Sequence, residues 1–453
     1  MDIKTMVHSY RDELVERLGK LVSINSVKGT TTEDAPFGEG PKQALLTALQ
    51  MLESDGFHTV DLDHYAGYAE MGEGEQLIGI IGHLDVVPAV AEDGWNTDPF
   101  TMVQKGETLY GRGVSDDKGA VVAAMIAMKV LRDMNIPMHK RVRLIMGTNE
   151  ESGSRCLRYY VEKEGHVDFG FTPDGNFPGV YGEKGMVSAR YYSKNTNILD
   201  IRGGTAGNIV CSKCTVKLKG VCYSTKKLTD FFNNNSIDFE VENNDDIVTI
   251  TVNGKAAHAS TPDLGVNAIS YLLVGLKEAG LQDPFVDFYC SHIGLHTDGE
   301  GLGCKLKDEY GALTLNCGII QMNDGVIEGT IDIRFPVTMT SKQVIRGMQD
   351  HLEDEGGYVD IKFGGEPLFY SPDSVLVSNL LAAYQSVTGD METQPMTIGG
   401  GTYAKGIHNT IAFGCAFPNR DYHIHDANEF VDIDELLLQA EIYAQAIINL
   451  LNA

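Results

Sequence analysis

Acidic residues and a histidine follow several apolar segments, at points where β-strands are expected to end. Glu150 and Glu151 come at the end of an apolar run, residues 142–149, that has the pattern of a buried strand. A similar run ends at His83, and Asp85 follows two residues later. Neighbouring carboxylates repel each other unless a positive charge holds them together. The pattern therefore indicates a bound metal ion close to the ends of these strands.

Two further acidic positions fit the same design. Asp116 and Asp117 precede an apolar helix expected over residues 119–134, and Asp174 lies in a turn after another apolar run. Strand ends of an open α/β sheet meet at one edge, and ligands bind there. The sequence thus predicts a hydrolytic site that holds two metal ions.

The residue types divide naturally between two metal positions. Two divalent cations about 3.5–4 Å apart can share a carboxylate and lower the pKa of a water molecule to near 7. Asp116 is the expected bridging ligand. His83 and Asp174 would complete one position, and Glu151 would belong to the other.

The remaining residues would orient the ligands and move protons. Asp85 is expected to accept the second N–H of the His83 imidazole and so fix its tautomer. Glu150 would stay unligated, as a carboxylate able to carry the proton of the attacking water. The second metal still needs a nitrogen ligand, and spacing alone leaves both His423 and His425 open.

Composition excludes several classes of protein. The 453 residues are 43% hydrophobic and 22% charged, as in globular proteins, and the net charge of −27 would repel nucleic acid. No apolar run approaches the roughly 18 residues of a membrane span, and the first residues do not have the pattern of a signal peptide. Eight scattered cysteines suit a reducing cytoplasm, and the Cys-x-x-Cys pair at Cys211 and Cys214 is expected to be structural.

Periodicity indicates two kinds of domain. Helical patterns at residues 1–22, 41–54 and 119–134 alternate with strands, which predicts an α/β domain with a mostly parallel sheet. Its first part is expected over residues 1–185, and its second part over residues 371–453.

Residues 186–370 have a different character and are expected to form an inserted α+β domain. Alternating stretches such as residues 247–252 predict an antiparallel sheet. Helices are expected at 224–234, 267–279 and 341–355. After the insert, a helix at 375–387, a strand at 409–413 and a helix at 432–449 would return to the style of the first domain.

Combined motifs over essentially the whole chain resemble one family. They lie at residues 82–88, 95–100, 109–119, 150–154, 254–262 and 425–429. The chain is similar to the co-catalytic di-metal metallopeptidases and deacylases, which include carnosinases, glutamate carboxypeptidase, acetylornithine deacetylase and succinyl-diaminopimelate desuccinylase. Within them it most resembles the bacterial PepV-type dipeptidases.

The resemblance implies further site residues. The ending His-x-x-Asn-Glu selects His425 over His423 as the metal ligand. It also implies that the insert is a lid whose His258 stabilises the oxyanion, where a donor contributes several kcal/mol. The substrate's carboxylate end would be bound by Asn208 and Arg334 and by a backbone cradle that includes Gly401 and Thr402. A cis peptide bond is expected between Asp116 and Asp117.

The resemblance also suggests an activity. We expect a cytoplasmic dipeptidase in which a metal-bound hydroxide attacks unblocked dipeptides, with Glu150 as general base and acid. The cofactor would be two divalent ions, zinc first, with manganese or cobalt also suitable. The lid, about 185 residues long, resembles the enlarged lid of the PepV-type enzymes, which takes the place of a partner subunit, and this resemblance implies a monomer. An N-acyl amino acid deacylase or carboxypeptidase is the alternative, and a non-catalytic peptide-binding module is a third hypothesis.

Overall fold

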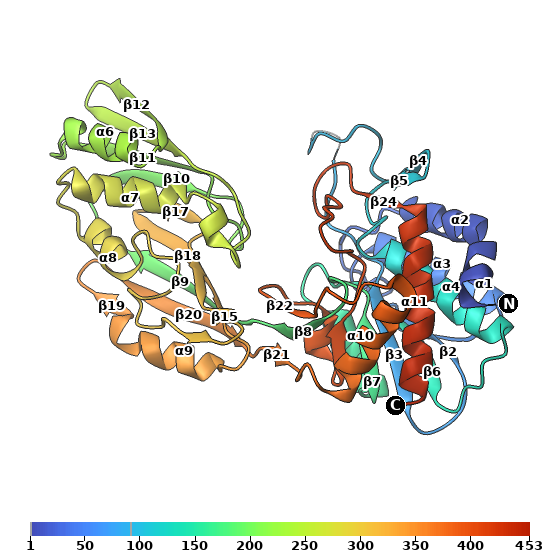
Figure 1. Cartoon of the computed structure of the whole chain (residues 1–453). Helices are drawn as coiled ribbons and strands as arrows, with labels where there is room; N and C mark the ends of the chain where they lie inside the picture. Colours follow the sequence, from blue (N-terminus) through green and yellow to red (C-terminus); the bar gives the residue numbers. More distant parts are fainter. Residues whose placement is uncertain (1, 91–92) are drawn as a thin grey trace. The chain divides into compact units, whose positions relative to one another are not determined.

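The computed structural model describes residues 2–90 and 93–453. The chain forms two compact units, which Figure 1 shows coloured along the sequence. Unit 1 contains Met1–Gly182, Tyr370–Met396 and Gly401–Ala453, and unit 2 contains Glu183–Phe369 together with Thr397–Gly400. The short segment Thr397–Gly400 therefore belongs to unit 2, although the residues on both sides of it belong to unit 1.

Unit 1 is built on a sheet whose strands follow the order β1-β2-β6-β3-β7-β23-β8. The four central strands β6, β3, β7 and β23 run parallel, and the outer pairings are antiparallel. The α/β class expected from the sequence is confirmed, with the parallel part confined to these central strands. The bounds are β1 (His58–Leu62), β2 (Ala66–Met71), β3 (Leu77–His83), β6 (Arg141–Gly147), β7 (Phe169–Thr172), β8 (Val180–Glu183) and β23 (Thr410–Ala412).

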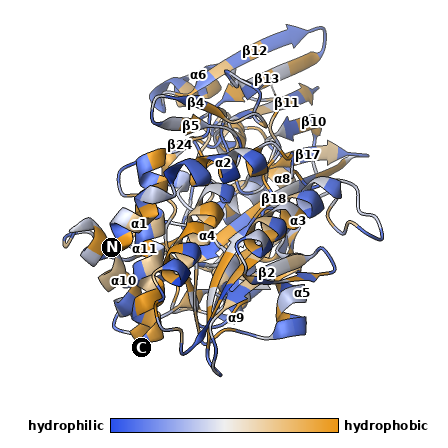
Figure 2. Ribbon diagram, turned by 90° about the vertical axis from the view of Figure 1, so that its right-hand side faces the viewer, coloured by the Kyte–Doolittle hydropathy of each residue, from blue (hydrophilic) through white to orange (hydrophobic). Residues whose placement is uncertain are grey.

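Helices of unit 1 bury the apolar faces that the sequence predicted. Strand β3 is buried along its whole length, as expected for a parallel strand whose two faces are covered. Helix α4 is almost entirely buried and contacts β3, β6, α2 and α11, and its ribbon is largely orange in Figure 2. The bounds are α1 (Ile3–Ser9), α2 (Arg11–Val22), α3 (Glu39–Ser54), α4 (Lys118–Asp133), α5 (Arg155–Glu164), α10 (Val375–Thr388) and α11 (Ile433–Leu451).

Two details of unit 1 differ from the sequence-based expectation or add to it. The helix expected over residues 1–22 is two helices, because the chain leaves helical geometry at Tyr10; Met1 lies outside the described residues. A separate three-stranded sheet joins β24 (Phe430–Asp432), β5 (Thr108–Tyr110) and β4 (Val103–Lys105). This small sheet brings the segment before β24 alongside the segment after β5.

Unit 2 is built on an antiparallel sheet, as expected, in the order β12-β13-β11-β10-β17-β18-β9-β20-β19, with β16 paired to β18. Burial alternates along β9 and β11, so one face of the sheet carries the core. The long strands are β9 (Gly185–Ser193), β10 (Ile198–Gly203), β11 (Lys213–Lys219), β12 (Asp238–Asn244), β13 (Ile247–Asn253), β18 (Val326–Phe335) and β20 (Gly357–Gly365), and the short ones are β16 (Thr314–Asn316), β17 (Ile320–Asn323) and β19 (Glu353–Asp354).

Four helices pack on the unit 2 sheet. Helix α7 contacts β11 and β13, and α9 contacts β9 and β20. Their bounds are α6 (Thr225–Asn234), α7 (Ala268–Glu278), α8 (Pro284–His292) and α9 (Ser341–Met348). The helix expected to reach residue 355 ends at Met348, and a single 3-10 turn, Gln349–His351, separates it from β19 and the turn into β20.

Helix α4 begins at a close approach of two backbones, which makes Gly119 a sensitive position. A Cβ atom on Gly119 would lie 2.0 Å from the main-chain oxygen of Val114. We therefore expect Gly119→Ala to displace the loop before α4 and to destabilise the protein by about 1–3 kcal/mol. The melting temperature measures this effect. Gly29→Ala, where the nearest atom would be 3.5 Å away, is the matched control, and equal melting of both variants would contradict the prediction.

Candidate metal centre and the polar cluster of unit 2

Most of the predicted metal-site residues lie at or after the carboxyl ends of the four parallel strands. His83 is the last residue of β3, Glu150 and Glu151 follow β6, and Asp174 follows β7. His425 lies in the segment between β23 and β24. In the sheet register His83 is paired with Gly147, so the exits of β3 and β6 are level with each other. This is the edge at which open α/β sheets bind ligands.

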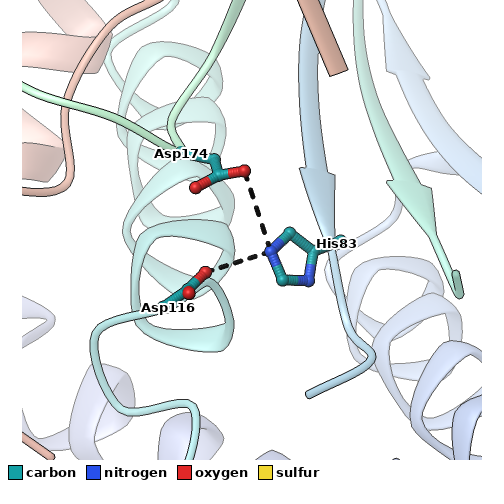
Figure 3. A group of neighbouring side chains, drawn as sticks. All are labelled: His83, Asp116 and Asp174. Carbon is teal, nitrogen blue, oxygen red and sulfur yellow. Dashed lines mark hydrogen bonds and ion pairs between the residues drawn. The ribbon is translucent and has the colours of Figure 1, made fainter. Parts of the chain in front are cut away.

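Asp116 joins the first of two groups of potential ligands. It lies just before α4, and its Oδ1 is 3.1 Å from Nε2 of His83. The same ring nitrogen is 3.9 Å from Oδ2 of Asp174. Dashed lines in Figure 3 mark the contacts of His83 with Asp116 and Asp174. The ligand atoms of the three residues all lie within 4.8 Å of one another. The set can therefore hold one metal ion.

The second oxygen of Asp116 faces the second group. Its Oδ2 is 3.0 Å from Nε2 of His425, and that nitrogen is 3.1 Å from Oε1 of Glu151. Asp116 thus offers one oxygen to each group, as a carboxylate that bridges two cations would. His423 belongs to neither group, and its ring contacts Phe430 instead.

The electrostatics of the site favour positive charge. Hydrogen bonds to the carboxylates of Asp116 and Glu151 raise the pKa of His425 to about 11. Burial disfavours a charged His83, but its hydrogen bond with Asp116 and the nearby acids outweigh this and raise its pKa well above the usual value. Imidazole nitrogen and carboxylate oxygen together suit zinc, manganese or cobalt. The residues present therefore fit a pair of divalent cations.

Glu150 lies beside this site but outside both ligand groups. Burial, followed by the negative charge of Asp174, raises its pKa well above the usual value for a glutamate. A nearby cation acts in the opposite direction and favours the ionised form. A carboxylate that stays outside the ligand groups is free to accept and donate a proton.

Asp85 holds the site together in a way that differs from the expectation. Nδ1 of His83 donates to the main-chain oxygen of Asp85 at 2.9 Å, whereas the Asp85 carboxylate is 3.6 Å away. The carboxylate instead accepts hydrogen bonds from the main-chain nitrogens of Glu150 (2.9 Å) and Glu151 (3.2 Å). The main-chain oxygen thus fixes the imidazole tautomer and leaves the Nε2 lone pair for a metal. The carboxylate ties the exit of β3 to the exit of β6.

Glu429 is a site residue to which the sequence analysis gave no role, although it falls within the His-x-x-Asn-Glu motif. Its side chain is fully buried. It accepts hydrogen bonds from Nη1 of Arg112 (2.8 Å) and from the main-chain nitrogens of Gly113 (2.9 Å), Ser115 (2.9 Å) and Asp116 (3.1 Å). One carboxylate therefore fixes the loop that carries Asp116 and joins it to the segment that carries His425. The cis peptide bond expected between Asp116 and Asp117 is present in the same loop.

Three of the predicted site residues, Asn208, His258 and Arg334, lie in unit 2. Contacts around Gly399 and a short backbone pairing link them. Nη1 of Arg334 donates to the main-chain oxygen of Gly399 at 3.3 Å. A Cβ on Gly399 would lie 2.2 Å from Cβ of Ser260, so this glycine packs directly on the residue two places after His258. The main-chain nitrogen of Ala259 donates to the oxygen of Asn208 at 2.9 Å, next to a bridge between Ile209 and His258. Asn208, His258 and Arg334 therefore belong to one cluster.

The surroundings of this cluster show how it is supported. Asp332 forms a two-pronged ion pair with Arg334, with N–O distances of 2.6 and 2.9 Å. Asn316, which is buried, donates from Nδ2 to the main-chain oxygens of Gly207 (3.1 Å) and Ile209 (3.0 Å), and so holds the backbone on both sides of Asn208. The sequence motifs did not reveal either supporting residue.

The two remaining predicted residues, Gly401 and Thr402, belong to unit 1. Oγ1 of Thr402 accepts a hydrogen bond from the main-chain nitrogen of Ala404 at 3.2 Å and caps the short helix Tyr403–Gly406. They follow directly on the unit 2 segment Thr397–Gly400. The predicted cradle therefore falls where the chain passes from one unit to the other.

Unit 2 contains other residues of types that can bind metals. Cys211 and Cys214 are both buried and free. A third group, His296, Asp298 and Glu300, lies in unit 2. Both of its carboxylates form ion pairs with Lys305, at 2.7 and 2.9 Å. Among residues 2–90 and 93–453, no helix is long and apolar enough to cross a membrane.

The chain is similar to known proteins in sequence and in fold. Residues 79–449 match the description Peptidase family M20/M25/M40. Proteins of Staphylococcus haemolyticus and Staphylococcus aureus that are named as dipeptidases are 32% identical over 471 residues and 33% identical over 466 residues, in each case over 99% of both chains. The crystal structure of human carnosine dipeptidase 1 has the same fold, with a TM-score of 0.61 and 17% identity over 100% of this chain and 98% of that one.

These similarities establish the class of the protein. The chain belongs to the M20/M25/M40 family of peptidases. It is a metallohydrolase with an α/β catalytic fold and an additional α+β domain.

The role of Glu429 can be tested through metal affinity. In Glu429→Gln, either orientation of the amide places an NH₂ group against two N–H donors. We expect the loop of Asp116 to shift and metal affinity to fall about 10–100-fold, as for other residues that orient ligands. Competition with a chelator measures the affinity. Glu441→Gln, at a largely buried glutamate paired with His8, is the control, and an unchanged affinity in Glu429→Gln would contradict this role.

Proposed function

We propose that the protein is a metal-dependent dipeptidase that hydrolyses unblocked dipeptides. The observation that carries the proposal is the position of Asp116 between two groups that each contain a histidine and a second carboxylate. Glu150 stands beside them as an acid outside both groups. The similarity to proteins named as dipeptidases supports the same substrate class.

The metal ligands follow from the two groups. His83, Asp116 and Asp174 would hold one divalent ion, and Asp116, Glu151 and His425 would hold the other. When bound, such a pair polarises a carbonyl oxygen and lowers the pKa of a coordinated water to about 7. The ligand types suit zinc, with manganese and cobalt as further candidates.

Glu150 is proposed to move the proton. As general base it would take a proton from the attacking water, and as general acid it would pass this proton to the leaving amine. Its position supports this role, because the Asp85 carboxylate fixes the main chain at both Glu150 and Glu151. Asp85 would therefore support catalysis by positioning both the base and a metal ligand.

Residues of unit 2 are proposed to complete the site. His258 would donate a hydrogen bond to the oxyanion that forms as the carbonyl is attacked. Arg334 and Asn208 would bind the terminal carboxylate of the dipeptide, together with the backbone at Gly401 and Thr402. The ion pair with Asp332 supports this by holding the guanidinium of Arg334 in a fixed orientation.

The domain organisation is part of the proposal. Residues 186–370 would form a lid inserted between the two parts of the catalytic domain, residues 1–185 and 371–453. Closure of such a lid excludes bulk water and longer peptides, which suits a dipeptidase. We propose that the protein acts as a monomer in the cytoplasm.

A substrate panel tests the proposed activity. Metal-stripped protein refilled with zinc, manganese or cobalt should hydrolyse unblocked dipeptides, including β-Ala-His, because the proposed site binds the carboxylate end of the substrate and the proposed lid admits only short peptides. Tripeptides and N-acetyl or N-succinyl amino acids should react much more slowly. Amine release detected with ninhydrin is the measurement. Faster cleavage of the N-acylated compounds would instead identify a deacylase, and binding without turnover would identify a peptide-binding protein.

The proposed role of Glu150 predicts a separation of metal binding from catalysis. Glu150→Gln keeps the shape of the side chain but cannot accept the proton, so turnover should fall by at least about 10²-fold. Metal content, measured by elemental analysis, should stay unchanged. Glu162→Gln, an exposed substitution in α5, should leave both quantities unaltered. Retained turnover in Glu150→Gln would exclude this residue as the base.

A further inference from the structure

The imidazole of His258 has a defined partner in unit 2. Its Nδ1 lies 2.7 Å from Oγ of Ser260. The main-chain nitrogen of Ser260 donates to the same Nδ1 at 3.3 Å. Two donor-capable groups of one residue thus converge on one nitrogen of the ring.

The main-chain contact determines the direction of both hydrogen bonds. An amide nitrogen carries a proton and no available lone pair, so it can only donate. Nδ1 must therefore accept, and the hydroxyl of Ser260 must also donate to it. In a neutral imidazole one nitrogen accepts and the other carries the proton. The proton of His258 consequently lies on Nε2.

We propose that Ser260 is a positioning residue that holds His258 in the tautomer whose Nε2–H donates. The inference rests on the proposed role of His258 in the dipeptidase reaction. An oxyanion is stabilised by a donor that is already oriented before charge develops. The other tautomer would present a lone pair at Nε2 and repel that charge. Ser260 would act only through His258, without touching the substrate.

The local backbone holds Ser260 in this place. The main-chain nitrogen of Thr261 donates to the oxygen of His258 at 3.0 Å, which closes a turn around Ser260. Gly399 packs on the other side, because a Cβ there would lie 2.2 Å from Cβ of Ser260. The isolated bridge between Ile209 and His258 fixes the backbone at His258 itself. The hydroxyl is therefore confined near Nδ1 by its own backbone and by its neighbours.

The tautomer can be observed directly in the wild-type protein. Side-chain ¹H–¹⁵N spectra of ¹⁵N-histidine-labelled, zinc-loaded protein distinguish the two tautomers, and the signals of His258 are identified by their loss in His258→Gln. We expect the pattern of a ring protonated at Nε2. A ring protonated at Nδ1 would overturn the proposal. This measurement needs no enzymatic activity, so it separates a failure of this inference from a failure of the proposed function.

Kinetics of Ser260→Ala test the consequence. We expect kcat for an unblocked dipeptide to fall about tenfold, less than the roughly 10²–10³-fold loss when an oxyanion donor itself is removed. KM should change less than twofold, because Ser260 does not contact the substrate. Ser260→Cys retains a weak donor of similar size and should recover part of kcat. Ser291→Ala, whose hydroxyl bonds to the oxygen of Asp287 in α8, is the matched control and should keep the wild-type kcat.

The two readouts decide the proposal together. A lower kcat in Ser260→Ala, with a changed His258 spectrum and an unchanged melting temperature, is the expected result. An unchanged kcat and an unchanged spectrum would show that Ser260 does not position the ring. A variant that melts early leaves the wild-type spectrum as the deciding measurement.

Discussion

The carboxylate of Asp116 is the contact on which the candidate metal centre depends. Its two oxygens face two different histidines, His83 and His425, at 3.1 and 3.0 Å. Each oxygen therefore defines one of the two ligand groups, and a small displacement would weaken both. The buried carboxylate of Glu429 prevents such a displacement by binding the main chain of the Asp116 loop. Glu429 thus holds the backbone of the loop, and Asp116 presents its two oxygens to the site.

Concentrating acids at one edge of a sheet has an electrostatic cost that a cation removes. Burial, followed by the charge of Asp174, raises the pKa of Glu150, and burial raises the pKa of Asp85 to about 6. Hydrogen bonds to Asp116 and Glu151 also raise the pKa of His425, to about 11, which favours its positively charged form. A divalent ion satisfies the same demand for positive charge. The acids of the site therefore carry more negative charge than the nearby histidines neutralise.

Unit 2 contains separate polar side chains in place of a group of clustered acids. Hydrogen bonds and an ion pair with other residues of unit 2 hold these side chains or the backbone beside them. Asn316 fixes the backbone on either side of Asn208, Asp332 orients Arg334, and Ser260 engages Nδ1 of His258. The contacts of Asn316 join segments that are far apart in the sequence, whereas Asp332 and Ser260 each lie two residues from the side chain that they orient. These contacts give three separate polar side chains defined orientations within one antiparallel domain.

The sequence alone determined the fold class and the members of the candidate metal site. Buried parallel strands read as continuous apolar runs, so the positions of His83, Glu151 and Asp174 at strand ends were visible as a pattern. The antiparallel insert was visible in the same way, from its alternation. These signals are local, because each depends on residues that are neighbours along the chain.

Only the tertiary structure decided which partner each side chain takes. The sequence predicted that the carboxylate of Asp85 would bind His83, but the main-chain oxygen does so and the carboxylate binds the turn after β6. Spacing alone left His423 and His425 open; the resemblance of the His-x-x-Asn-Glu motif selected His425, and the structure places His425 beside Asp116 and Glu151. Glu429 and Ser260 were seen only as parts of motifs. Such choices depend on how distant segments meet and on which buried donors need an acceptor. The sequence therefore specified the residues, and the packing of the chain specified their contacts.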